Sequence, residues 1–400
     1  MLGAYLVWRT GLRDRGVITD HLEFGRRLLH GLDVYAPFEG KPLHPPHPPS
    51  FGLLVLPFAL LPERAARFTW GIAQVLCLWS LACRLRHAVP PLDARRFHIA
   101  LVFTALLASR YILRDTHGGG GNLINLWLVV GAWTAALGGH PTRAGLLLGL
   151  SLVTKPVGVL VVPLLWLVGS TRAAISSLVC AAGYVVVALA LLHFDPSPFI
   201  AWLEGSFHYG TRPDVFAAPE RGFPEFSWMN QCLRCAVART LGEVPREFAE
   251  QVPWFVPGLG LAAPTVAWFA RGAAALLLVG TFLRIRAGAA SRTAWSLAAV
   301  LALSLLLSPI SWKAHHVALI PALFSLGALA ARGARWPWVF GGGYFLLCVL
   351  GEEVVGKEFK NVQQSSYFTT LGTLGLLAIC LAHLGRPGAT PTVPTPLPPR

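Results

Sequence analysis

Eleven apolar runs constrain the fold of this chain more than any other feature of its sequence. They cover residues 65–86, 97–109, 122–138, 144–154, 156–169, 172–193, 261–283, 293–308, 315–331, 337–351 and 367–384. Several approach the ~20 residues that a helix needs to cross a bilayer. Only 13% of the residues are charged, against about 25% in a soluble domain. The sequence therefore predicts an all-α, polytopic transmembrane bundle with about eleven hydrophobic helices.

Two apolar segments are too short to cross a bilayer. Residues 144–154 run into Lys155-Pro156, where the proline should end the helix. Broken helices at membrane depth occur where they line a cavity or are buried in protein. Residues 51–62 are bounded by prolines, and we expect them to dip into the outer interface.

The charges of the connecting loops predict the orientation. If 65–86 runs from outside to inside, alternate loops carry many arginines and a single acid, Asp93. The positive-inside rule then places the long segments 10–62 and 195–260 outside the cytoplasm. We expect a multi-pass plasma-membrane protein without a cleavable signal peptide, with one membrane domain over 1–385 and a disordered cytoplasmic tail over 386–400. The net charge of +14 lies largely in these short loops, so nucleic-acid binding is not expected.

With this topology, the unusual polar residues fall on the outer face. They include Asp20, Asp33, Asn122, Lys155, Asn230, Gln231, Trp312, Lys313, His315 and His316. Acids, a lysine and tandem histidines that converge on one membrane face suggest a functional site on the extracytoplasmic side. The alternative is that outer loops are simply polar.

Several motifs resemble those of known enzymes in both order and spacing. They are T-D-x-x-x-F and L-L-x-G-x-D-V-Y within 19–35, P-P-S-F-G-L-L-V-L-P-F-A-L-L-P at 48–62, G-N-L-I-N-L at 121–126, A-G-L-L-L-G-L-S-L-V-T-K-P at 144–156, M-N-Q-C-L at 229–233 and L-L-S-P-I-S-W-K-A-H-H at 306–316. Together they resemble glycosyltransferases of the GT-C fold, and more narrowly family 87, the polyprenyl-phosphate-mannose-dependent α-mannosyltransferases. The resemblance implies inverting transfer of a hexose, mannose in this family, from a polyprenyl-phosphate donor to a lipid-linked or envelope glycan. It implies no cofactor.

Such a transfer needs a base for the acceptor hydroxyl. Asp20 matches the family's early aspartate, although an aspartate there could instead cap the following helix. Asp33 is a second candidate for the site, in sugar binding, unless Gly31–Tyr35 is merely a turn. His315 and His316 could act as base or as donors to the leaving phosphate, or they could cap a helix or face the lipid headgroups.

The transfer also needs positive charge at the leaving phosphate. Lys155 is the main candidate, because a lysine between two apolar half-helices is costly unless it faces a cavity or an anion. The alternative is a lysine that snorkels to the interface. Lys313 is weaker. Asn122, Asn230, Gln231 and Trp312 are predicted to bind substrate.

Other chemistries have weaker support. The tandem histidines lack a spaced set of further ligands, so no metal is expected. Gly118–Gly121 is followed by Asn122 rather than by the lysine of a phosphate-binding nucleotide loop. A transporter or lipid-linked-sugar flippase remains as the alternative function, although the polar residues crowd one face and no inverted repeat is apparent. A glycan ligase or an inactive scaffold is a third possibility.

Overall fold

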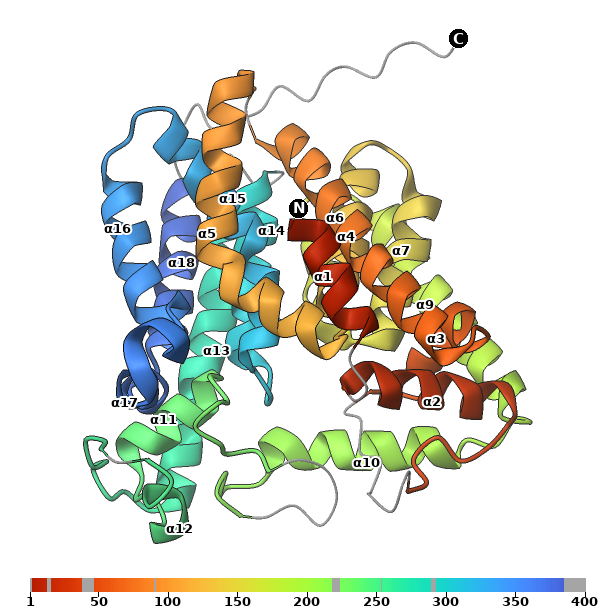
Figure 1. Cartoon of the computed structure of the whole chain (residues 1–400). Coiled ribbons are helices and arrows are strands. Elements are labelled where there is room, and N and C mark those ends of the chain that lie inside the picture. Colours follow the sequence, from red (N-terminus) through yellow and green to blue (C-terminus); the bar gives the residue numbers. More distant parts are fainter. Residues whose placement is uncertain are drawn as a thin grey trace.

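The computed structural model of the protein describes residues 2–12, 16–37, 47–89, 91–217, 224–252, 254–288 and 293–384, and these form helices without a β-strand (Figure 1). The predicted tail 386–400 lies outside the described residues. The elements are α1 (Leu2–Gly11), α2 (Val17–Leu29), α3 (Phe51–Ala59), α4 (Glu63–Ala88), α5 (Ala94–Gly118), α6 (Asn122–Leu137), α7 (Pro141–Thr154), η1 (Pro156–Gly158), α8 (Val161–Leu167), α9 (Thr171–Leu191), α10 (Ser197–Thr211), α11 (Leu233–Leu241), α12 (Arg246–Ala249), α13 (Ala263–Ala287), α14 (Ala294–Leu307), η2 (Lys313–Leu319), α15 (Ile320–Ala331), α16 (Trp336–Tyr344), η3 (Phe345–Val349), α17 (Glu352–Ser365) and α18 (Phe368–Leu384).

The described helices confirm an all-α, multi-pass membrane protein. Five are long and apolar enough to cross a membrane, and two bent pairs raise this number to seven. Three shorter apolar helices, α6, α14 and α18, accompany them. All the predicted apolar runs fall on helices, but the count of about eleven separate hydrophobic helices is not confirmed. One physical reason is that 144–154 and 156–169 form a single bent pair rather than two spans.

The break predicted at Lys155-Pro156 is confirmed. α7 ends at Thr154, Lys155 is extended with φ −156° and ψ 100°, and the following pair η1–α8 turns away by 120°. Pro156 causes the break, because its ring disfavours helical backbone at the preceding residue and it has no N–H to donate. The freed carbonyl of Lys155 accepts a hydrogen bond of 3.1 Å from the side-chain amide of Asn125. The chain is thus reversed within the bundle without leaving this carbonyl unpaired.

The helices that do not cross the bundle gather at one of its ends. Figure 1 shows α2, α10, α11, α12 and α17 at that end, with α10 lying crosswise over it. The described parts of the two long segments, 10–62 and 195–260, therefore meet there. This arrangement brings residues that are far apart in the sequence to one site.

Two glycines allow α7 and α9 to pack closely. A Cβ at Gly145 would lie 2.7 Å from the Cβ of Ser176, and one at Gly149 would lie 2.9 Å from the backbone nitrogen of Ala181. Small residues four apart permit such close backbone approach between membrane helices. The α7–α9 pair supports the half of the broken helix that ends at Lys155.

We predict that Gly149→Ala destabilises the protein by about 1–3 kcal/mol, because the added methyl group must displace backbone atoms of α9. The matched control is Gly183→Ala, since Gly183 on α9 faces open space. There alanine should be neutral or stabilising by up to about 1 kcal/mol. Thermal unfolding in detergent measures both variants. Equal stability of the two variants would contradict the packing argument.

Candidate active site

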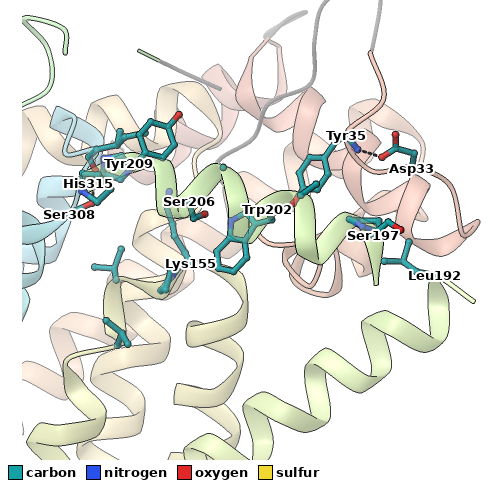
Figure 2. A pocket seen from close by; sticks show the side chains of 18 of the residues that line it. Asp33, Tyr35, Lys155, Leu192, Ser197, Trp202, Ser206, Tyr209, Ser308 and His315 are labelled. Carbon is teal, nitrogen blue, oxygen red and sulfur yellow. Dashed lines mark hydrogen bonds between the residues drawn. The ribbon is translucent and has the colours of Figure 1, made fainter. Parts of the chain in front are cut away.

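A cavity of about 1120 Å³ lies beneath α10, at the end of the bundle where the short helices gather. It is bounded by the loop after α2, the break between α7 and α8, the end of α14 and the start of η2. Figure 2 shows Lys155, Ser308 and His315 toward one end of the cavity, and Asp33 and Tyr35 toward the other. The lining residues are Gly31, Leu32, Asp33, Tyr35, Ala36, Pro37, Lys155, Pro156, Val157, Val159, Leu160, Leu192, Asp195, Ser197, Pro198, Ala201, Trp202, Gly205, Ser206, Tyr209, Ser304, Leu305, Leu307, Ser308, Pro309, Ile310 and His315.

Lys155 places a positive charge in the wall of this cavity. Within the described part of the chain its ammonium forms no salt bridge. Its electrostatic partner is the buried carboxylate of Asp115. That carboxylate is held by the side-chain amide of Asn122 at 2.7 Å and by the backbone N–H of Leu123 at 2.9 Å. The negative charge therefore sits behind Lys155, and the ammonium is left for a ligand in the cavity.

The glycine run 118–121 serves this arrangement. Gly119 has φ +68°, a left-handed conformation that favours glycine. A side chain at Gly120 would collide with the Asp115 carboxylate. The run is thus the tight connection that brings Asp115 against the start of α6.

His315 faces the cavity as a hydrogen-bond donor. The backbone N–H of Trp312 donates to its Nδ1 at 2.9 Å, and its own backbone N–H donates to the Trp312 carbonyl at 2.8 Å. Because Nδ1 accepts, the proton of the neutral imidazole is on Nε2. A ring held in this way presents an N–H rather than a lone pair to the cavity.

Two further histidines, which the sequence analysis did not single out, lie behind Lys155. His21 and His47 are 2% and 5% exposed, and their ring centroids are 5.4 Å apart. Burial, followed by the charge of Lys155, lowers the pKa of His21 to about 3 and that of His47 well below its ordinary value. Both rings are therefore neutral near pH 7. Lys155 thus has no competing cation in this pair.

One stripe of α10 forms the outer wall of the cavity. The stripe consists of Pro198, Ala201, Trp202, Gly205, Ser206 and Tyr209. Their spacing of three and four residues is that of one helix face. The indole N–H of Trp202 is buried and has no hydrogen-bond partner among the described residues. In the sequence, the helical periodicity of residues 197–211 could have indicated this helix. The polar residues of the surrounding segment make that periodicity hard to detect.

Three of the predicted site residues, Asp33, Lys155 and His315, line the cavity. Asp33 does so while its Oδ1 accepts a hydrogen bond of 2.9 Å from the backbone N–H of Tyr35. It is therefore both part of a turn and part of the wall.

Asn122, Asn230 and Gln231 do not line the cavity, and substrate binding is not supported for them. All three are buried in hydrogen bonds to the protein. The Asn230 amide donates to the Pro309 carbonyl and accepts from the Ser311 N–H, each at 2.8 Å. The Gln231 amide donates to the carbonyl of Trp228 at 3.0 Å. The Asn230 side chain, together with the Gln231 backbone N–H that donates to the Ser311 carbonyl at 2.8 Å, holds the turn that precedes His315.

Four other predicted residues also lie outside the cavity lining. His316 is buried, donates from Nδ1 to the Trp312 carbonyl at 3.0 Å and packs against Tyr111, so its place is that of a core residue. Trp312 is the N-cap of η2 and Lys313 is its first residue, and neither is among the lining residues. Asp20 is exposed on the first turn of α2, whose N-cap is Gly16, so the helix-cap alternative for Asp20 is wrong.

The chain is similar to known proteins over most of its length. Residues 46–309 match glycosyltransferase family 87. A relative from Mycolicibacterium smegmatis is named as a polyprenol-phosphate-mannose-dependent alpha-(1-2)-phosphatidylinositol pentamannoside mannosyltransferase. It is 28% identical over 319 residues, which are 78% of this chain and 67% of the relative. Among solved structures, ArnT from Cupriavidus metallidurans, determined with undecaprenyl phosphate, aligns with a TM-score of 0.41 and 16% identity over 96% of this chain and 76% of its own.

The family match covers more than half of the chain and includes Lys155, its supports Asp115 and Asn125, and the α10 stripe. The chain therefore belongs to glycosyltransferase family 87 and is a membrane glycosyltransferase.

Proposed function

We propose that this enzyme transfers a hexose, mannose as in its relative, from a polyprenyl-phosphate donor to a lipid-linked or envelope glycan. The observation that carries the proposal is that Lys155 and His315 line the same cavity, where the charge of Lys155 acts on the His315 ring. The M. smegmatis relative is named for a polyprenol-phosphate-mannose donor, which supports the same donor class here.

The phosphate of the donor is proposed to lie between Lys155 and His315. The ammonium supplies a charge and the Nε2–H supplies a directed hydrogen bond, and both stabilise the negative charge that grows as the phosphate leaves. In an inverting displacement the acceptor oxygen attacks the anomeric carbon, the bond from that carbon to the phosphate oxygen breaks, and the acceptor proton passes to a base. Because the Nδ1 of His315 already accepts from Trp312, His315 suits the donor role better than the base role.

The remaining walls suit the other parts of the donor. Leu160, Leu305 and Leu307 give the cavity an apolar side that can receive the first isoprene units. On the opposite wall, Trp202 has an indole N–H without a partner among the described residues, which can donate to a sugar hydroxyl. An aromatic ring in this position also covers the face of a sugar.

Asp20 is proposed as the base. Its neighbour on α2, His21, feels the charge of Lys155, so the first turn of α2 lies beside the phosphate site. Asp20 is exposed there. An exposed carboxylate can be reached by the hydroxyl of an incoming acceptor. Asp33, in the cavity wall, is proposed to bind sugar hydroxyls.

The site is proposed to face away from the cytoplasm. The connections α4–α5, α6–α7, α8–α9, α13–α14 and α15–α16 carry the arginines of the short loops. The cavity lies at the end where the two long segments meet. A transporter is not favoured, because the chain belongs to a glycosyltransferase family.

We predict that Lys155→Ala lowers the rate of transfer about 10²- to 10³-fold, whereas Lys155→Arg keeps part of it, because a preorganised charge is worth roughly 3–4 kcal/mol at such a transition state. The assay follows radiolabelled mannose from polyprenyl-phosphate mannose into glycan in membranes that contain the enzyme. Lys357→Ala, on the exposed face of α17, is the control. Full activity of Lys155→Ala at normal expression would refute the phosphate role, and relocation of label without product would indicate transport.

We predict that Asp20→Asn lowers turnover by about 10²-fold or more without a change in thermal stability. The side chain is exposed and is not the N-cap of α2, and asparagine keeps its shape, so the helix should be preserved. Asp33→Asn is the matched comparison, because asparagine can keep the turn bond to Tyr35. Asp33→Asn should raise KM more than it lowers kcat. If Asp33→Asn instead lowers kcat by about 10²-fold and Asp20→Asn mainly raises KM, Asp33 is the base.

We predict that a cysteine at Met229, which is 57% exposed, reacts with a membrane-impermeant reagent in intact cells. A cysteine at Thr142, at the start of α7, should react only after the cells are opened. Both are introduced into a Cys83→Ser background, since Cys83 is exposed. Protection of position 229 together with labelling of position 142 would reverse the proposed orientation.

A further inference from the structure

η2 separates two groups of positive charge. It is a 3₁₀ helix with three residues per turn, so positions two apart point to different faces. His315 lines the cavity, whereas Lys313 does not and lies among other cations. These cations are Arg110 and Arg114 of α5 and Lys360 of α17. We call these four residues, Lys313 included, the second basic cluster.

The carboxylates near the second basic cluster neutralise only part of it. Glu353 pairs with Arg110 at 2.7 Å, and Glu352 pairs with Lys360. Within the part of the chain that the structure describes, Arg114 and Lys313 form no salt bridge. About two positive charges are thus left over, beside a membrane-spanning helix.

Arg110 gives a second and independent observation. Its side chain is only 12% exposed. One of its nitrogens meets Glu353, but Nε and Nη2 are buried and have no hydrogen-bond partner among the described residues. Buried donors of a charged group are costly when they remain unpaired. A guanidinium fork beside a lysine is the arrangement that phosphate groups prefer.

We propose that the second basic cluster binds the phosphodiester of an anionic lipid acceptor, while Lys155 and His315 hold the phosphate of the donor. This inference rests on the proposed function and names the chemical class of its acceptor. α17 lies at the same end of the bundle as α10, so the two phosphate sites share one face of the protein (Figure 1). With η2 between them, the two lipids approach the site from different sides, and the glycan of the acceptor reaches around η2 to the cavity.

Bisubstrate kinetics in nanodiscs test this assignment with Arg114→Gln, Lys313→Gln and the control Lys357→Gln. Arg114 and Lys357 are exposed, so their loss does not disturb packing. The acceptors are a mannosylated phosphatidylinositol and the same glycan released from its lipid phosphate. Each cluster variant should raise KM for the phosphate-bearing acceptor roughly tenfold or more. KM for the donor and for the released glycan should not change, nor should any value for Lys357→Gln.

Each result that contradicts the assignment has a different meaning. A rise in KM for the donor would mean that the cluster serves the donor phosphate, and unchanged KM for every substrate would mean that it has no ligand role. Inorganic phosphate that competes with the lipid acceptor in the wild type, at constant lipid composition, would support a defined phosphate site. If activity instead depends only on the fraction of anionic bulk lipid in the nanodisc, the cluster binds headgroups in general and the assignment is overturned.

A binding measurement separates failure of the inference from failure of the proposed function. Native mass spectrometry of the protein with phosphatidylinositol, against phosphatidylcholine, counts retained lipids without any transfer reaction. Retention of one phosphatidylinositol by the wild type and its loss in Arg114→Gln and Lys313→Gln would support the cluster, even if no sugar transfer is found. Equal retention by all variants would overturn it.

Discussion

The break between α7 and α8 is the constraint on which the site depends. Pro156 ends a helix that would otherwise cross the bundle, and Lys155 is left extended at the reversal. A lysine in this apolar setting is stable only with a partner for its charge. Asp115 provides the permanent partner from behind, and the cavity in front is open to a second anion. The proposed donor phosphate would be that second anion.

The rest of the bundle holds this one residue in place. Ser151 donates to Asn125 at 2.7 Å, and Asn125 in turn donates to the carbonyl of Lys155. The connection through Gly119 and Gly120 presses Asp115 against the start of α6, where two backbone or side-chain N–H groups fix it. Close packing of α7 on α9 fixes the helix that ends at the break. The buried polar groups around the break are thus supported by other polar groups.

Sequence patterns predicted best those features that are determined by residues close together in the chain. The apolar runs and the Lys155-Pro156 break follow from solvent and from proline geometry, and both are present in the structure. Asn230 and Gln231 lie outside the cavity lining, which the sequence did not indicate, because a buried hydrogen-bonded amide and a substrate-binding amide look alike in sequence. His315 and His316 are adjacent, yet only the fold decides which of them faces the cavity. The α10 stripe, His21 and His47 depend on tertiary contacts between distant segments, which no local pattern records.

The central claim is that Lys155 and His315 together bind the phosphate of a polyprenyl-phosphate donor. Electron cryomicroscopy of the protein in nanodiscs with polyprenyl phosphate tests it most directly. The account predicts a phosphate within about 3 Å of both Lys155 Nζ and His315 Nε2, with the first isoprene units against Leu160 and Leu305. A phosphate bound instead at Lys313 and Arg114, with the space before Lys155 filled by another part of the molecule, would contradict it.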